Sequence, residues 1–363
     1  MVMPEDPKVE DFGLGPKLET REIPHNPWLA ILEWDALKVL AAVSPARPIE
    51  FAFTESRKLQ AGANTPHRQI LVSGGLGDMM CRLCAAIVDS GVFTNFGNPT
   101  VFWKPEVEKT KPVAEALKHV FFDWTKGYYP WRSDPKRLQL FAFLLIQVNR
   151  FVLLHEAAHI LHNHGGSKPG NILGTVVDGA APPELDEVTA ANKMARELIA
   201  DGEAFHLHFR LLEQRFAEPE DEMAKLLNSK LVGSPRERLR MTLISAFMVF
   251  QILDYREWSI ETARLRSHPP APFRMKAIYA TAVDLKHTGL SPDTIEDEIV
   301  QARILGTMVV DIALNRFPQL GWIKKVDGRE FDAMFSLIHE NMHKWADPTR
   351  LRSASTRTIA PGI

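Results

Sequence analysis

Residues 151–164 read FVLLHEAAHILHNH and place two histidines four positions apart, with a glutamate between them. On a helix His155 and His159 lie on one face, so their imidazoles can bind the same metal ion. Glu156 is rotated by about 100° from His155 and can face a water molecule without binding the metal itself. Imidazole nitrogens suit zinc, which lowers the pKa of a bound water to about 7. Glu156 could then act as the general base for attack on a carbonyl.

The neighbours of this motif predict that it is buried. Apolar residues cover the helix on all sides, namely Phe151, Val152, Leu153, Leu154, Ala157, Ala158, Ile160 and Leu161. Burying two histidines and a glutamate without partners is costly, and a bound metal ion would offset that cost. The alternative is that the three polar side chains are satisfied inside the core without a metal.

A second segment, MARELIADGEA at residues 194–204, could complete such a site. Glu197 and Asp201 are four residues apart and share one helical face, where like charges repel each other. Their apolar neighbours predict burial, and a nearby cation would offset both the burial and the repulsion. We expect Glu197 to be the third zinc ligand and Asp201 to accept a hydrogen bond from a zinc-binding histidine. The alternative is a solvated acidic stripe.

HEAAH followed by Glu197-Leu-Ile-Ala-Asp201 resembles the HExxH…ExxAD signature of gluzincin metallopeptidases. The HtpX-like class and the prenyl-protein peptidases carry this signature, as does the soluble phage-exclusion type, Lit, which is the nearer parallel. The segment SHPPAPFR at 267–274 is similar to the His-Pro-Pro…Arg segment of HtpX-like enzymes. The resemblance implies His268 as a transition-state donor and Arg274 as an orienting or substrate-binding cation. It also implies a zincin-like core, in which the strands of IEFAF…QILVSGGL carry a substrate-binding edge.

Together, the motifs and the resemblance predict a zinc metalloendopeptidase that acts on a protein or peptide substrate. In this hypothesis His155, His159 and Glu197 bind Zn²⁺. Glu156 activates the attacking water and later passes the proton to the leaving amine. One alternative is a non-catalytic zinc-binding protein with a regulatory or interaction role in a stress or defence system. A second alternative is a helical interaction protein in which the motif is coincidental.

A second HExxH, His339-Glu340-Asn-Met-His343, lies near the end of the chain. Its helix carries an apolar stripe at three- and four-residue spacing, made of Phe331, Met334, Phe335, Ile338, Met342 and Trp345. Such a stripe is typical of an amphipathic packing helix. No ExxAD segment follows, so we expect no metal site at this second motif.

Three further patterns have simpler interpretations. His162 and His164 could replace the carboxylate ligand of the site, although lining the cleft or bonding the following loop is favoured. The single CxxC at 81–84 offers too few ligands for a structural zinc and predicts two small buried residues. The run GGLGD at 74–78 lacks the other residues of a P-loop and predicts a tight strand-to-helix turn.

Composition excludes several classes of protein. The 363 residues are 45% hydrophobic and 24% charged, which is typical of a folded globular chain. The formal net charge is −2, so neither nucleic acid nor a membrane surface is an expected partner. Two cysteines indicate a reducing compartment. The most apolar stretches contain polar residues too early for a bilayer span, and the first residues are unlike a targeting peptide. We therefore expect a soluble, cytoplasmic protein.

The elements that must position the motifs are predominantly helical. We expect an α+β fold with a small N-terminal sheet and buried zinc-binding helices. Strands are expected at 49–53, 69–73 and 100–103. Helices are expected at 74–88, 136–163, 186–216, 219–229, 235–265, 272–287, 291–316 and 328–345. An extended N-terminal arm over 1–48 would precede a single zincin-like domain over 49–346 and a flexible tail over 347–363.

Overall fold

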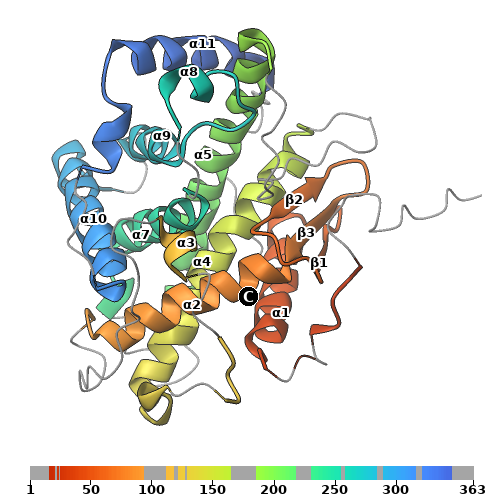
Figure 1. Ribbon diagram of the computed structural model, residues 1–363, viewed down its shortest axis with the longest axis vertical. Coiled ribbons are helices and arrows are strands. Elements are labelled where there is room, and N and C mark those ends of the chain that lie inside the picture. The colour runs from red at the N-terminus through yellow and green to blue at the C-terminus, as the bar shows by residue number, and fades with distance from the viewer. Residues whose placement is uncertain are drawn as a thin grey trace, which may run out of the picture.

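The computed structural model shows a mainly helical protein with one small sheet near the start of the chain (Figure 1). The structure describes residues 16–20, 23, 25–93, 112–117, 122–126, 129–164, 185–217, 230–254, 258–283, 289–315 and 321–345. Within these residues, the expected combination of a small N-terminal sheet and a predominantly helical remainder is confirmed.

The sheet has three strands in the order β1-β3-β2, with bounds Glu50–Thr54 (β1), Ala61–Asn64 (β2) and Gln69–Ser73 (β3). Strand β1 is parallel to the central strand β3, whereas β2 is antiparallel to it and packs against the long helix α4 (Pro135–Leu161). The strands expected at 49–53 and 69–73 are confirmed. The sequence does not predict β2, because Ala-Gly-Ala-Asn contains no β-branched or aromatic residue. The strand expected at 100–103 lies outside the described residues.

The run GGLGD forms the expected tight turn from β3 into helix α2 (Gly74–Ser90). The side chain of Ser73 caps this helix by accepting a hydrogen bond from the backbone N–H of Leu76. A Cβ atom on Gly75 would lie 2.2 Å from the carbonyl oxygen of Arg57, so the backbone approach there requires glycine. Both cysteines are buried in α2, as expected.

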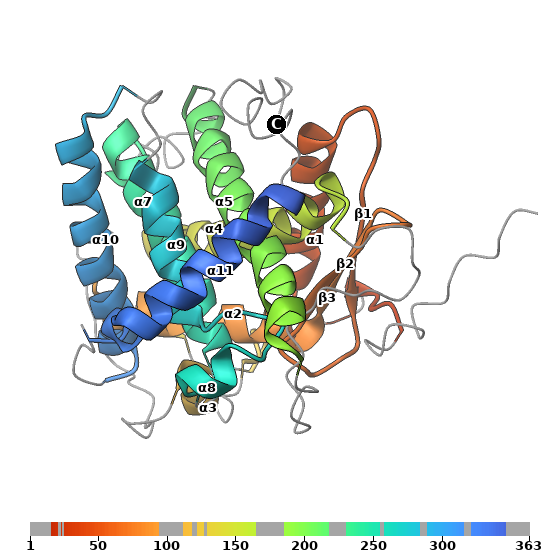
Figure 2. The same ribbon diagram turned by 90° about the horizontal axis from the view of Figure 1, so that it is seen from above.

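Further helices make up most of the rest of the fold. They are α1 (Trp28–Val43), α3 (Val113–Leu117), α5 (Glu187–Ala217), α7 (Pro235–Leu253), α8 (Ile260–Ala263), α9 (Ala271–Val283), α10 (Pro292–Ala313) and α11 (Arg329–Trp345). Two short 3₁₀ helices, η3 (Pro130–Ser133) and η5 (Ile323–Val326), complete the described elements. Helix α4 contacts α1, α2, α5, α7 and the sheet, and α11 crosses in front of α5 in Figure 2. The first histidine motif therefore lies on the central helix of the fold.

Helix α4 has a defined start and a buried anchor. Pro135 occupies its first turn, and the side chain of Asp134 accepts hydrogen bonds from the backbone N–H groups of Lys136 and Arg137. Farther along, Arg150 donates to both carboxylate oxygens of Asp35 on α1, at 2.8 and 2.5 Å. This buried two-point pair fixes α4 against α1 one turn before the histidine motif begins.

Two element predictions are wrong. Residues 28–43 form helix α1 instead of an extended arm, because Leu32, Ala36, Val39 and Leu40 recur at helical spacing and are fully buried. The single helix expected at 235–265 is two helices, since α7 ends at Leu253 and α8 starts behind a capping box at Ser259. The expected helix at 219–229 and the expected tail at 347–363 lie outside the described residues, as does nearly all of segment 165–185, which joins the two motif helices.

Helix α4 is also the one described helix that is long and apolar enough to cross a membrane by length and composition. The polar residues that the sequence predicts to interrupt this apolar stretch, Gln147, Asn149 and Arg150, do not remove the helix from this class. However, 78% of its most apolar window is buried inside the protein.

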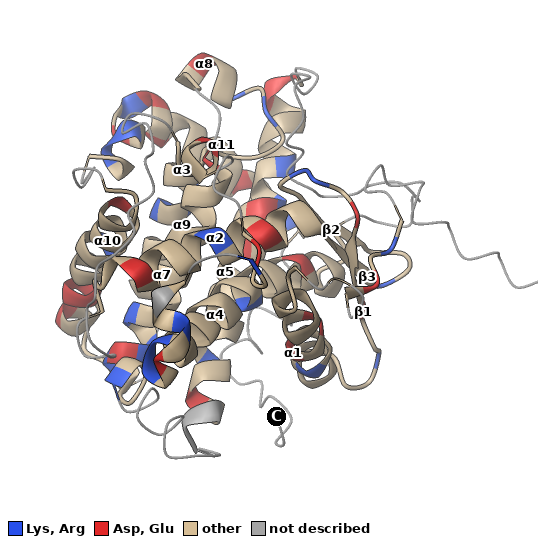
Figure 3. Cartoon of the chain, turned by 60° about the horizontal axis from the view of Figure 1, so that its bottom comes forward, with Lys and Arg blue, Asp and Glu red and all other residues tan. Residues whose placement is uncertain are grey.

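Charged residues of both signs are interspersed along the helices (Figure 3). The arginine-rich start of α7 is an example, because Arg236 and Arg240 both pair with the buried carboxylate of Glu298 on α10. These pairs join two neighbouring helices and compensate a carboxylate inside the fold.

Candidate metal centre

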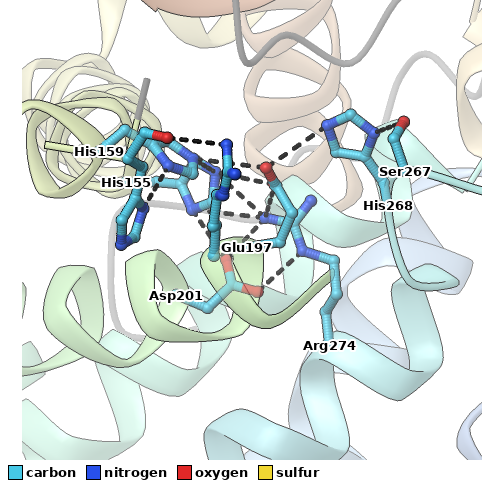
Figure 4. A network of polar contacts seen from close by, with 9 residues as sticks. His155, His159, Glu197, Asp201, Ser267, His268 and Arg274 are labelled. Carbon is cyan, nitrogen blue, oxygen red and sulfur yellow. Dashed lines mark hydrogen bonds and ion pairs between the residues drawn. The ribbon is translucent and has the colours of Figure 1, made fainter. Parts of the chain in front are cut away.

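The two sequence motifs meet where α4 packs against α5 (Figure 4). The Nε2 atoms of His155 and His159 are 3.2 Å apart. The carboxylate oxygens of Glu197 lie 3.3 Å from Nε2 of His155 and 3.5 Å from Nε2 of His159. One possible ligand atom from each residue lies within 4.8 Å of the others, and all three side chains are buried. This group could therefore hold a metal ion.

The donor atoms of the group fit such an ion. Two imidazole nitrogens and a carboxylate oxygen are ligands that divalent transition metals accept. Here the three donors converge inside the protein at 3.2 to 3.5 Å from one another, and burying polar groups in this way is costly. A cation would remove that cost, so the arrangement agrees with a metal site better than with three independent core residues.

Asp201 holds His155 from its outer side, as the sequence predicts. Its Oδ1 atom lies 2.9 Å from Nδ1 of His155. Arg274 on α9 donates to both oxygens of Asp201, at 2.8 Å from Nε and 2.6 Å from Nη2. The guanidinium also lies 3.7 Å from Glu197. Of the two roles that the resemblance implies for Arg274, this geometry agrees with the orienting one.

These contacts set the protonation of the group. Burial alone would lower the pKa of His155, but the neighbouring Asp201 carboxylate raises it to about 9. Burial opposes ionisation of Glu197, yet the nearby histidines, His268 first, hold its pKa well below the usual value. Burial likewise opposes ionisation of Asp201, and Arg274 outweighs it and lowers the pKa of that carboxyl. The two like charges that were expected to repel are thus both compensated.

His268 approaches the group from the loop that precedes α9. Its Nε2 atom lies 3.5 Å from Glu197, and its Nδ1 atom lies 2.8 Å from the hydroxyl of Ser267. Figure 4 places His268 across Glu197 from the two motif histidines. Burial lowers the pKa of His268, although 23% of its side chain remains exposed. This residue is therefore at the site and reachable from outside it.

Glu156 is buried beside the group, and its Oε2 atom has no hydrogen-bond partner among the described residues. With His155 and Arg274 it lines a pocket whose other walls are apolar: Ala61, Leu76, Met80, Phe151, Val152, Val249, Phe250, Ile252 and Leu253. Burial raises the pKa of Glu156 to about 8. A carboxyl group held in this way has no visible structural task and is suited to exchange a proton.

One contact of the group is absent from the sequence predictions. Nδ1 of His159 lies 2.8 Å from Nδ1 of His164, just beyond the end of α4. Burial lowers the pKa of both rings, that of His164 to about 3. The suggestion that His162 or His164 replaces the carboxylate ligand is not supported, since Glu197 occupies that position.

The second HExxH has different surroundings. His339, Glu340 and His343 are exposed on α11, with the two imidazole centroids 5.6 Å apart. No group of potential metal ligands forms around them within the described part of the chain. The expected apolar stripe is largely confirmed, because its other members are buried or partly buried whereas Phe335 is 38% exposed.

No family model matches the chain, and neither a curated protein nor a solved structure shows significant similarity to it. The class of the site therefore follows from its own geometry. It is a buried cluster of two histidines and a glutamate that could hold a metal ion. Beside it lie a partly exposed histidine and a buried carboxyl group, one oxygen of which has no partner among the described residues.

Proposed function

We propose that this protein is a zinc metallopeptidase that hydrolyses peptide bonds in a protein or peptide substrate. The observation that carries the proposal is the position of Glu156, which is buried beside a ready set of metal ligands and has one carboxylate oxygen without a partner among the described residues. A purely structural site has no use for such a carboxyl. The resemblance to the gluzincin signature supports the proposal, since the residues matching its motifs lie together despite their separation in sequence.

His155, His159 and Glu197 would hold the metal, and zinc suits two imidazoles and one carboxylate. When bound there, zinc would lower the pKa of a water molecule to about 7 and polarise the substrate carbonyl. The chain of Arg274, Asp201 and His155 would fix the orientation of one imidazole ligand.

Glu156 would act as the general base. It takes the proton from the attacking water and later delivers it to the leaving amine, so no net proton remains on the enzyme. The pKa of about 8 in the metal-free site would fall when a cation is bound nearby, which favours the carboxylate needed to accept the proton. The apolar walls beside it limit access of bulk water to the reacting groups.

His268 would donate a hydrogen bond to the oxyanion that forms on the substrate carbonyl. Its partial exposure and its distance of 3.5 Å from Glu197 leave it free to reach a substrate at the open side of the site. The resemblance assigns the substrate-binding edge to the strands of IEFAF…QILVSGGL, but β3 is the central strand of the sheet. Strand β2, the edge strand that packs on α4, would offer main-chain hydrogen bonds to an extended substrate in its place.

Metal content tests the metal site, and hydrolysis tests the reaction. Wild type, Glu197→Ala and Glu156→Gln would be purified without added metal and measured by elemental analysis. We expect about one zinc per chain in wild type, clearly less in Glu197→Ala and unchanged content in Glu156→Gln.

The same three proteins would then be incubated with a mixture of synthetic peptides and analysed by mass spectrometry. We expect Glu156→Gln to cleave about 10²–10⁴-fold more slowly than wild type. Absence of zinc from the wild type, even after zinc is offered, would disprove the proposal. Zinc without any dependence of function on Glu156 would favour the non-catalytic zinc-binding alternative.

A further inference from the structure

The end of helix α4 brings a residue back to the metal group. Asn163 adopts a left-handed backbone conformation with φ 53°. The N–H of His164 donates to the carbonyl of His159 at 2.9 Å, and the N–H of Asn163 donates to the carbonyl of Ile160 at 3.2 Å. These two bonds define a Schellman cap, which turns the chain back over the last turn of the helix. Asparagine is one of the few residues other than glycine that readily adopt this conformation.

In such a cap the residue after the left-handed position usually makes an apolar contact with the last turn. Here the two residues at those positions are His164 and His159, and their imidazoles meet instead. Their ring centroids are 5.1 Å apart at 67°, and both rings are fully buried. The carbonyl of His164 also accepts a hydrogen bond of 2.8 Å from Arg196 on α5. The position of His164 is thus fixed by both ligand helices.

The contact between the rings constrains where their protons lie. Nδ1 of His159 and Nδ1 of His164 are 2.8 Å apart, so one must donate and the other accept. The opposite nitrogen of His159, Nε2, faces Glu197 and His155. A metal bound at that Nε2 requires its lone pair, which leaves the proton of a neutral ring on Nδ1. His159 is then the donor and His164 the acceptor.

We propose that His164 is a positioning residue that fixes the tautomer and ring orientation of His159 for metal binding through Nε2. The inference rests on the proposed function insofar as the group binds a metal. Its consequence is that the two imidazole ligands have unlike outer partners: a carboxylate, Asp201, for His155 and a neutral imidazole for His159. The buried site gains a second oriented ligand without a further negative charge.

Two variants of His164 separate the effect of its hydrogen bond on zinc affinity from the effect of the volume of its ring. His164→Phe keeps a buried ring but removes the acceptor, whereas His164→Asn keeps an acceptor near the position of Nδ1. We expect the Phe variant to bind zinc about 10–100-fold more weakly in competition with a chelator, and the Asn variant to recover most of the affinity. His208→Phe is the matched control, because His208 is a fully buried histidine of α5 outside the group. It should leave zinc affinity unchanged.

A spectroscopic readout distinguishes positioning from a general loss of structure. NMR of protein labelled with ¹⁵N at histidine should show the proton of His159 on Nδ1, with and without zinc. In His164→Phe we expect a mixture of tautomers in the metal-free protein. Equal zinc affinity in wild type and His164→Phe, or a proton on Nε2 of His159, would overturn the inference. If wild type binds no zinc, the proposed function fails, but the tautomer measurement on metal-free protein still decides the role of His164.

The backbone cap offers an independent test. Asn163→Gly keeps the left-handed conformation accessible, whereas Asn163→Val strains it. We expect the Gly variant to keep the zinc affinity of wild type. The zinc affinity of the Val variant should be lower than that of wild type, as in His164→Phe. Unchanged affinity in Asn163→Val, in a protein whose circular dichroism matches wild type, would contradict the proposed route from cap to ligand.

Discussion

The chain contains the same five-residue pattern twice, once on α4 and once on α11, and the two copies differ in nearly every physical respect. On α4 the two histidines and the glutamate are buried in the centre of the fold, and a carboxylate from a second helix lies 3.3 Å away. On α11 the corresponding side chains are exposed, and the apolar side of the helix packs on α5. Both sequences satisfy the HExxH pattern, so the pattern alone does not distinguish them.

The difference shows what turns a motif into a site. Exposed histidines can be hydrated by water and gain little from a cation, whereas converging buried donors can be satisfied together by one. The third ligand matters equally, because two imidazoles from one helix leave most of a metal's coordination unsatisfied. Helix α5 supplies Glu197 to the first motif, and no described element supplies a carboxylate to the second. The predictions below test this contrast in order of decreasing effect.

The largest expected effect is loss of the metal. His159→Ala removes a ligand from the buried motif and should reduce bound zinc from about one per chain to near none. His343 is the second histidine of the exposed motif, as His159 is of the buried one. His343→Ala is therefore the matched change, and it should leave the zinc content unchanged. Elemental analysis of both purified proteins decides the matter. Loss of zinc from His343→Ala would mean that the contrast between the two motifs is wrong.

A smaller effect is expected from the carboxylate behind the ligand. Asp201→Asn weakens the hold on His155 and should reduce zinc affinity about 10–100-fold. It also leaves the buried Arg274 without its main ionic partner, which should cost about 3–5 kcal/mol in the free energy of unfolding. Chelator competition and urea unfolding measure the two effects. Asp332→Asn, at an exposed position of α11, is the control, and a loss of similar size there would contradict this account.

A buried histidine outside the metal group, His208, predicts that the free energy of unfolding depends on pH. Burial lowers the pKa of His208 on α5 to about 3, against about 6.5 in an unfolded chain. Between these values only the unfolded chain takes up the proton, so the folded state loses stability as pH falls. The contribution of His208 should approach about 1.4 kcal/mol per pH unit in this window. Urea unfolding of wild type and His208→Gln at pH 7 and pH 5 checks it, and identical slopes would exclude it.

The smallest effect should come from the glutamate of the exposed motif. Glu340→Gln should change neither zinc content nor peptide cleavage, and it should alter the free energy of unfolding by less than about 0.5 kcal/mol. The matching variant Glu156→Gln is expected to abolish most of the cleavage. Similar cleavage by the two variants would mean that the buried glutamate has no special role.

Most of the site could be predicted because its members are linked by short helical spacings. Four-residue steps place His155 with His159 and Glu197 with Asp201 on shared faces, and the structure brings the two faces together. His268 and Arg274 were reached through the resemblance alone, because no local spacing connects them to the two ligand helices. Their proximity is nevertheless visible in the structure.

The contacts that escaped prediction depend on chain geometry beyond a single helical face. His164 meets His159 through a left-handed residue at the end of α4, and Asn163 is the only local signal of that turn. Strand β2 consists of small residues whose pairing depends on the neighbouring strand and α4, so its own sequence has little strand preference. The break between α7 and α8 had a signal in the capping box at Ser259, which the apolar periodicity on both sides obscured.

The pocket beside Glu156 has a consequence for proton transfer in the proposed reaction. Its walls are aliphatic and aromatic, and the polar side chains that line it belong to the site itself. The apolar side chains that the structure describes along those walls offer no relay by which a proton on Glu156 could reach solvent. The apolar side of the pocket therefore does not conduct protons. A proton taken from the water would stay on the carboxyl group until the leaving amine accepts it.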